Sequence, residues 1–249
     1  ATDRKDLRIL LSDLTFPAAT LDPEAVRPVA LAPLGVDDAH APVSDDEKER
    51  QRREWLDEFA RSLYGPIPDV DARVTCERIP SATTPGFEHL AVRVEVDGRT
   101  FQVDAGMWLP PGEHEPGSVP MIVALDLTGP AGVLNSTEYP LDPDSGVLIP
   151  DWLSGTMLVH GPINDVMRGT ASYRWPVDLI LERGWGLIIS CYGSWAPDDA
   201  DHWRSRGVGH LLGLEDDPKG PRQISLWAWS LSRLIDAACS IAEIDAANL

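Results

Sequence analysis

The sequence carries little positive charge. It holds 21 basic against 40 acidic residues, a formal net charge of −19, and only three of the basic residues are lysines. Proteins that bind nucleic acid or anionic lipid rely on clustered Lys and Arg to neutralise phosphate groups. We therefore expect no nucleic acid and no membrane as a partner, whereas a small-molecule or polysaccharide substrate is compatible with this charge.

Long apolar runs and a signal sequence are also missing. No segment reaches the roughly 18 consecutive apolar residues of a membrane-spanning helix. The opening residues, ATDRKDLRILLSDLTFPAAT, lack the continuous apolar segment of a signal peptide. Together with the odd number of cysteines, this favours a cytoplasmic location. A secreted protein is the alternative if Ala1 follows a cleavage site.

Cysteine is scarce. The three cysteines, Cys76, Cys191 and Cys239, are widely spaced and form neither a disulfide framework nor a zinc-binding pattern. Because Cys191 and Cys239 stand in apolar runs, we predict that both are buried free thiols.

The motifs of several enzyme classes are absent. The glycines follow neither the dinucleotide-binding nor the P-loop pattern. No serine has the Gly-x-Ser-x-Gly context of a hydrolase nucleophile, since Ser194 lacks the second glycine, and Cys191 lies within a strand-like run. The acidic segment 197–203 fits no calcium-loop spacing. From the residues alone we assign no catalytic residue, no metal and no cofactor.

The patterns that are present indicate an α/β domain over 45–249, preceded by an extended arm rich in Pro and Ala over 1–44. A helix is expected from a cap at Ser44 or Asp45 to Gly65, and a hairpin around Asp97-Gly98. The helix should carry an apolar stripe of Trp55, Leu56, Phe59 and Leu63.

Further along, MIVALDL and GLIISC indicate buried strands, and the second of them follows a helix that ends at Gly184. TGPAG, at 128–132, follows the first of these strands, where its backbone amides would line a site or form a plain turn. A last helix is predicted over 222–240. Its buried face is expected to contain Ile224, Trp227, Leu231, Leu234 and Ala238.

Nine tryptophans are a high count. Their positions predict core packing for Trp55, Trp185 and Trp227. Trp108, Trp195 and Trp203 stand near expected loops, where an indole is available to face a sugar ring.

Three stretches, in order, resemble one protein family. They are EFARSLYGPIPD, RGTASYRWPVDLILERGWGLIISCYGSWAPD and ISLWAWSLSRLIDAACSIAEIDAANL. Together they resemble the glucuronoyl esterases and the related acetyl xylan esterases, which are serine α/β-hydrolases, over about residues 50–249. The resemblance implies the N-terminal portion of an α/β-hydrolase fold, with a mostly parallel central sheet, an N-terminal antiparallel hairpin and flanking helices. The matching motif positions are Arg168, Gly169, Trp175, Gly184, Gly186, Tyr192, Asp198, Trp227 and Trp229, for which structural roles are expected.

The resemblance also implies where the chemistry lies. In this family the segment resembling IDAANL leads to a strand that ends at the nucleophilic serine, and the acid and histidine follow later. We therefore expect the serine to lie beyond residue 249 and this chain alone to lack the Ser-His-acid triad. The intact protein would hydrolyse a carboxylic ester without a cofactor, and a second chain is one way to supply the C-terminal half of the fold. The alternative is a catalytically inactive carbohydrate-binding or interaction module derived from a hydrolase.

Overall fold

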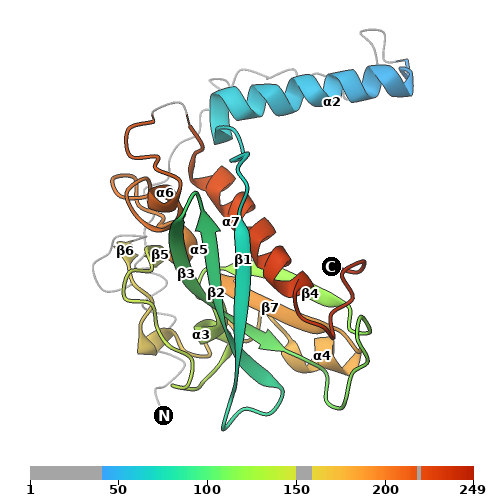
Figure 1. Cartoon of the computed structure of the whole chain (residues 1–249), viewed down its shortest axis with the longest axis vertical. Coiled ribbons are helices and arrows are strands. Elements are labelled where there is room, and N and C mark those ends of the chain that lie inside the picture. The colour runs from blue at the N-terminus through green and yellow to red at the C-terminus, as the bar shows by residue number, and fades with distance from the viewer. Residues whose placement is uncertain (1–40, 150–158, 218–219) are drawn as a thin grey trace, which may run out of the picture. The chain divides into compact units, whose positions relative to one another are not determined.

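The computed structural model describes residues 41–149, 159–217 and 220–249 (Figure 1). The chain divides into two units that meet between Glu54 and Trp55, and each is described by itself. Most of the expected arm, residues 1–40, lies outside the described residues, so the boundary at 44/45 stays a prediction.

The helices and strands of the described residues follow one another along the chain in the order α2 (Asp45–Phe59), the π-helix η1 (Ala60–Tyr64), β1 (Arg73–Pro80), β2 (Phe87–Val96), β3 (Arg99–Trp108), β4 (Met121–Asp126), α3 (Gly129–Val133), β5 (Val147–Ile149), β6 (Val159–Gly161), the 3-10 helix η2 (Asp165–Met167), α4 (Val177–Glu182), β7 (Gly186–Cys191), α5 (Tyr192–Trp195), α6 (Gly207–Leu211) and α7 (Gln223–Cys239).

The start of α2 has the predicted cap. Ser44 Oγ accepts a hydrogen bond from the Glu47 amide at 3.3 Å, and Lys48 pairs with Asp45 at 2.9 Å. Acidic residues in this first turn complement the positive end of the helix dipole.

The apolar stripe predicted for this helix is not buried. Leu56, Phe59 and Leu63 are all exposed, and α2 buries none of its residues. Helical spacing places these side chains on one face, but burial requires a surface that covers the face.

A mixed five-stranded sheet in the order β1-β2-β3-β7-β4 forms the centre of the second unit. β2 and β3 form the predicted hairpin, whose turn residues Asp97 and Gly98 both have positive φ angles of 49° and 77°. β3 pairs antiparallel with β7, and β4 pairs parallel with β7. These findings confirm the predicted α/β class with an N-terminal antiparallel hairpin. The expected mostly parallel sheet is instead mixed in the described residues, where three of the four neighbouring strand pairs are antiparallel.

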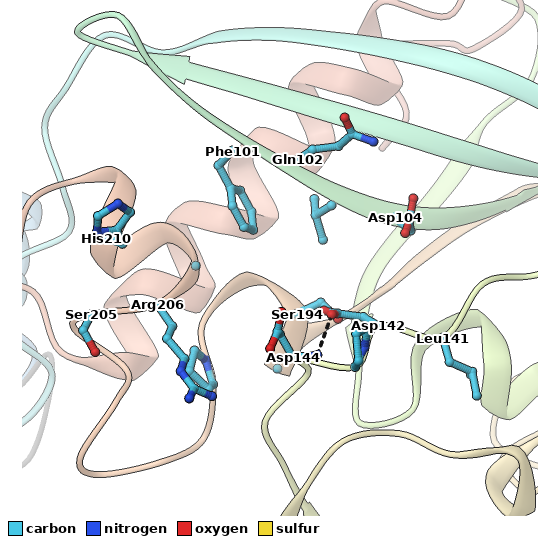
Figure 2. A pocket seen from close by; sticks show the side chains of 15 residues that line it. Phe101, Gln102, Asp104, Leu141, Asp142, Asp144, Ser194, Ser205, Arg206 and His210 are labelled. Carbon is cyan, nitrogen blue, oxygen red and sulfur yellow. Dashed lines mark hydrogen bonds between the residues drawn. The ribbon is translucent and has the colours of Figure 1, made fainter.

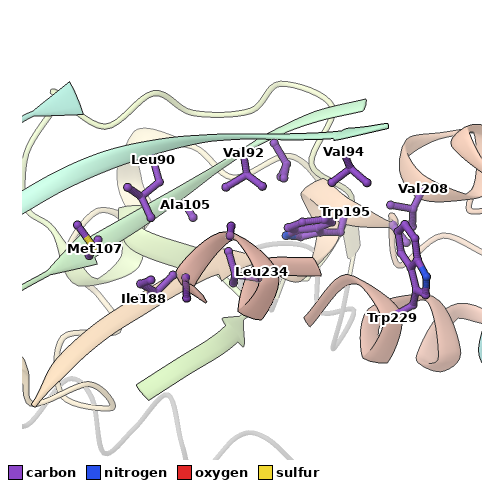
Figure 3. Close-up of a cluster of buried hydrophobic side chains, with 14 of the residues drawn as sticks. Leu90, Val92, Val94, Ala105, Met107, Ile188, Trp195, Val208, Trp229 and Leu234 are labelled. Atoms are coloured by element: carbon purple, nitrogen blue, oxygen red, sulfur yellow. The ribbon is translucent and has the colours of Figure 1, made fainter. Parts of the chain in front are cut away.

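The two faces of the sheet are covered by different helices. Figure 3 shows Leu90, Val92 and Val94 of β2 packed with Trp195 and with Trp229 of α7 on one face. On the other face Phe87, Leu187 and Ile189 belong to a second cluster, next to α3 and α4. The alternation along β2 and β7 follows from the two-residue period of a strand.

Several predicted burials are wrong. α7 buries Ser225, Leu226, Trp229, Ser230, Leu234, Ala237 and Ala238, so its core face is rotated from the predicted one, and Ile224 is 51% exposed. Trp108, Trp195 and Trp203 are buried and therefore not free to face a sugar, while Trp185 is 40% exposed. Cys191 is buried as predicted, but Cys239 is exposed.

β4 has a neighbour on one side and only a partial neighbour on the other. The segment after α7 runs parallel to the start of β4, with a bridge between Val119 and Ile244 and a hydrogen bond from the Met121 amide to the Asn248 carbonyl at 3.0 Å. In Figure 1 the C mark accordingly lies near β4. The central residues of β4 are half-buried, unlike the fully buried β7, which corrects the prediction that this strand is buried on both faces.

Candidate functional site at the carboxyl ends of the parallel strands

β4 and β7 end side by side. Asp126 and Cys191 are paired in the register of the two strands, so the turns that follow them lie at the same edge of the sheet. In open α/β sheets this edge, at the carboxyl ends of parallel strands, is where ligands bind.

The turn after β4 is held by a buried carboxylate. Asp126 Oδ1 accepts hydrogen bonds from the amide and the hydroxyl of Thr128, both at 2.9 Å, and Asp126 Oδ2 accepts one from Trp175 Nε1 at 3.1 Å. Gly129 has a φ of +54°, and a Cβ there would lie 2.8 Å from the Cys191 nitrogen. In the TGPAG segment, Thr128 therefore donates to the carboxylate that holds the turn, and Gly129 takes a left-handed conformation close to Cys191. Trp175 donates to the same carboxylate from another segment of the chain.

Arg168 and Gly169 anchor the excursion that follows α3. Arg168 Nη1 donates to the carbonyl oxygens of Ser136 and Tyr139 at 2.6 and 3.1 Å, and the Gly169 amide donates to the Ala131 carbonyl at 3.0 Å. A guanidinium that donates to two carbonyls holds a loop that has no regular structure of its own.

Three of the other motif residues meet beyond β7. The Tyr192 hydroxyl donates to Asp198 Oδ2 at 3.2 Å, and its ring packs edge-on to Trp227 at a centroid distance of 4.7 Å. Trp227 Nε1 also donates to the Ala196 carbonyl at 2.9 Å. These contacts tie the loop after β7 to α7.

The last three motif residues build the fold. Gly184 ends the α4 segment with a φ of +76°. Gly186 opens β7 where a Cβ would lie 2.6 Å from the Met121 methyl carbon, and Trp229 is buried in the core beneath the Arg233 guanidinium. None of the nine motif positions brings a nucleophile to the site.

A cavity of about 520 Å³ opens beside the turn after β7 (Figure 2). This volume is within the range of small-molecule sites. Figure 2 shows Arg206 and His210 on one side of the cavity and Asp104 and Asp142 on the other. Its lining is Phe101, Gln102, Val103, Asp104, Leu141, Asp142, Pro143, Asp144, Gly193, Ser194, Pro197, Ser205, Arg206, Gly207 and His210.

Asp104 is held in place by His89 and Ser190. Its Oδ1 lies 2.7 Å from His89 Nε2, its carbonyl accepts a hydrogen bond from Ser190 Oγ at 2.7 Å, and the His89 ring meets Tyr139 edge-on at 5.6 Å. Burial, with the nearby Asp104 charge, raises the pKa of Tyr139 well above its ordinary value, so this phenol stays protonated.

No serine hydroxyl is hydrogen-bonded to a histidine ring among the described residues. His89, His202 and His210 each pair through a ring nitrogen with a carboxylate, from Asp104, Asp199 and Glu215 respectively. Burial raises the pKa of the Cys191 thiol to about 11, which keeps it protonated at neutral pH. Within the described ranges, no group of three or more His, Cys, Asp or Glu side chains is placed to hold a metal ion. No described helix has the length and apolar character to cross a membrane.

Comparison with solved structures identifies the fold of this chain. No protein-family model and no curated protein matches the sequence. Among solved structures, a glucuronoyl esterase from Solibacter usitatus matches with a TM-score of 0.66 and 22% identity. The fold is that of the glucuronoyl esterases. The match covers 90% of this chain but only 57% of the Solibacter chain.

Two other carbohydrate esterases have the same fold. A promiscuous CE15 esterase from a marine bacterial metagenome matches with a TM-score of 0.58 and 18% identity, over 89% of this chain and 56% of its own. A CE15 glucuronoyl esterase from Caldicellulosiruptor kristjansonii matches with a TM-score of 0.55 and 18% identity, over 90% of this chain and 49% of its own. The chain thus spans about half the length of these glucuronoyl esterase-like structures.

The residues of the cavity were not found from the sequence. Asp104, Asp142 and Arg206 stand in three separate segments, and only the folded sheet brings them together. Asp126 and Thr128 had one sequence signal, the TGPAG segment after an apolar run, which the sequence also allowed as a plain turn.

Proposed function

We propose that this chain is the N-terminal part of a carboxylic-ester hydrolase of the glucuronoyl-esterase type, whose nucleophilic serine lies beyond residue 249. The observation that carries the proposal is the edge of β4. Ile244 forms a parallel bridge with Val119 just before β4, and the Asn248 carbonyl accepts a hydrogen bond from the Met121 amide at the start of β4. A strand that continues in this direction would end beside the Thr128 turn, at the carboxyl edge of the sheet.

The open part of that edge can be assigned from the strand alternation. The Met121 amide donates outward to Asn248, whereas the Pro120 carbonyl accepts from Gly186 on the β7 side. Since alternate residues point to opposite sides, the main-chain groups of Val123 and Leu125 point outward. Unpaired groups of this kind at half-buried positions favour another strand as a neighbour.

In the proposed reaction, the reacting groups and the residues that position them come from different parts of the polypeptide. A serine on the added strand attacks the ester carbonyl and is activated by a His–acid pair from the same missing portion. This chain contributes no reacting group. Its Asp126, Thr128 and Trp175 fix the turn that borders the reaction centre, and the ester is one carried by a sugar, in keeping with the carbohydrate esterases that share the fold.

The test begins with the intact mass of the protein from its natural source and with the coding sequence after Leu249. We expect a serine in a nucleophile turn within about ten residues of Leu249. The complete polypeptide should hydrolyse a methyl glucuronate ester, and replacement of that serine by alanine should abolish hydrolysis. A natural stop after Leu249, with no second chain copurifying, contradicts the proposal.

The rival function is a binding module without catalysis. One observation favours it: the described residues form a cavity of about 520 Å³ beside β7, which is within the size range of small-molecule sites. Binding of a saccharide by a natural protein that ends at Leu249 and shows no esterase activity would support the rival.

A further inference from the structure

The cavity beside β7 has two walls of opposite charge. Asp104, Asp142 and Asp144 line one wall, and Arg206 lines the other. The Asp104 carboxylate is paired with His89, so Asp142 and Asp144 are the acidic groups of the first wall. The Arg206 side chain has no ion-pair or hydrogen-bond partner among the described residues, and neither does the Asp144 carboxylate. The two walls therefore face the cavity without neutralising each other.

This arrangement discriminates against charged ligands. An anion that pairs with Arg206 would enter a space lined by Asp142 and Asp144, in a chain with a net charge of −19. A cation that pairs with the carboxylates would meet Arg206. A hydroxyl group fits both walls, because it donates to a carboxylate oxygen and accepts from a guanidinium at the same time.

The cavity also has apolar surface and a fixed shape. Phe101 and Leu141 line it beside the polar groups. Three of the segments around it pack backbone against backbone: a Cβ at Gly193 would lie 2.4 Å from the Gly146 carbonyl oxygen, and one at Gly207 would lie 2.1 Å from that of Trp195. Small-molecule sites commonly combine a preformed shape with apolar surface and a few polar groups.

We propose that this cavity is a binding site for an uncharged saccharide ring. Vicinal hydroxyl groups donate to Asp142 and Asp144 and accept from Arg206, while the ring C–H groups contact Phe101. The site is separate from the Thr128 turn, since no residue between Asp126 and Gly132 lines it. Binding requires no nucleophile, so it can be tested whether or not the proposed esterase reaction is correct.

The experiment measures binding to the full 249-residue chain by amide chemical shifts, with the Gly193 and Gly207 amides as reporters. The probes are methyl β-D-xylopyranoside, D-glucuronate, D-glucosamine and cyclohexylmethanol. They represent a neutral sugar, an anion, a cation and an apolar ring without vicinal hydroxyls. We expect the neutral sugar to shift both reporters with the tightest Kd of the four.

Two substitutions of exposed side chains separate the ligand classes without risk to the fold. Arg206→Gln and Asp144→Asn should each weaken xyloside binding by about tenfold, which corresponds to one hydrogen bond with a charged group. Arg73→Gln and Asp69→Asn remove the same charges from exposed positions outside the cavity and should leave the Kd unchanged.

Each other outcome overturns the proposal. If Arg206→Gln strengthens binding and glucosamine is the best probe, the site is a cation site. If Asp144→Asn strengthens binding and glucuronate is the best probe, it is an anion site. Equal shifts with cyclohexylmethanol would show an unspecific apolar cavity, and the absence of shifts at Gly193 and Gly207 with the xyloside would show that no sugar binds there.

Discussion

Ile244 forms a parallel bridge with Val119, so the segment after α7 runs in the same direction as β4. A helix that returns the chain parallel to the strand before it is the connection found in α/β sheets, and such connections are followed by a strand. The bridge thus places the segment after α7 beside the outer edge of β4. On that edge the main-chain N–H and C=O groups of Val123 and Leu125 point outward and can pair with a further strand.

The junction between η1 and α7 depends on Gly65. Its φ is +71°, and a Cβ would lie 2.8 Å from both the Arg222 nitrogen and the Gly220 oxygen. We expect Gly65→Ala to lower the free energy of unfolding by at least about 3 kcal/mol, because backbone strain and a clash with main-chain atoms add. Thermal and urea unfolding measure this loss.

Gly98→Ala is the matched control for Gly65→Ala. Gly98 has a similar φ of +77°, but a Cβ there meets nothing within 4 Å. This variant should lower the free energy of unfolding by about 1–2 kcal/mol, because only the strain of the left-handed conformation is added. Equal losses in the two variants would mean that the contact of Gly65 with Gly220 and Arg222 is unimportant.

Arg78 connects β1 to the segment after α7. It forms a bidentate pair with Glu88 and donates from Nη1 to both oxygens of Glu243, at 2.9 and 3.0 Å. The hydrogen bond from Arg78 lowers the pKa of Glu243 below its ordinary value. A group with a lowered pKa contributes stability above its unfolded-state pKa and loses it as the pH falls through its folded-state pKa.

Glu243→Gln should therefore destabilise the protein by about 1 kcal/mol at pH 7. This difference should fade as the pH falls below the ordinary glutamate pKa and through the lowered pKa of Glu243 in the folded protein. Urea unfolding of both proteins across this range gives the difference. Glu77→Gln, at an exposed position on the same strand as Arg78, should have no such pH-dependent effect. A difference for Glu243→Gln that persists undiminished in acid would show that the Arg78 pair is not its cause.

Trp175 should stabilise the Asp126 turn through its indole N–H. We expect Trp175→Phe to lower the free energy of unfolding more than Trp227→Phe does. The reason is that Trp175 donates to a buried carboxylate, whereas Trp227 donates to the neutral Ala196 carbonyl. Hydrogen bonds to charged groups contribute about 1.5–3 kcal/mol and neutral ones about 1 kcal/mol. Equilibrium unfolding compares the two variants, and the reverse order would argue against a carboxylate clamp at this turn.

The cysteines should react in the order of their exposure. Cys239 is exposed and should react first with a thiol reagent at about pH 8. Burial raises the pKa of Cys191 and that of Cys76 to about 11, which leaves about 0.1% of each thiol ionised at that pH. Peptide mapping after labelling gives the order. Rapid labelling of Cys191 in the folded protein would reopen the possibility of a thiol nucleophile.

The sequence predicted the elements whose signals are local. The Asp97-Gly98 turn, the Ser44 cap, the stop at Gly184 and the continuous apolar run of β7 each depend on neighbouring residues, and all are present. The resemblance to glucuronoyl esterases, drawn from three ordered motifs, also agrees with the fold.

What the sequence could not predict depends on packing between distant segments. The face of α7 that is buried is decided by how Trp229 and Leu226 fit the sheet, and the helical period alone allowed another face. Trp195 and Trp203 stand near loops that the sequence predicts, but other elements bury both of them. The cavity combines side chains from four segments that carry no common motif.

Amide hydrogen exchange at β4 tests the proposed function most directly. In the 249-residue chain, the Val123 and Leu125 amides should exchange much faster than those of Ile122 and Ala124, which point towards β7. In the complete polypeptide translated from the natural gene, all four should be equally protected, because the strand that bears the serine pairs with Val123 and Leu125. Protection of Val123 and Leu125 in the short chain, or their fast exchange in the complete polypeptide, would contradict the account.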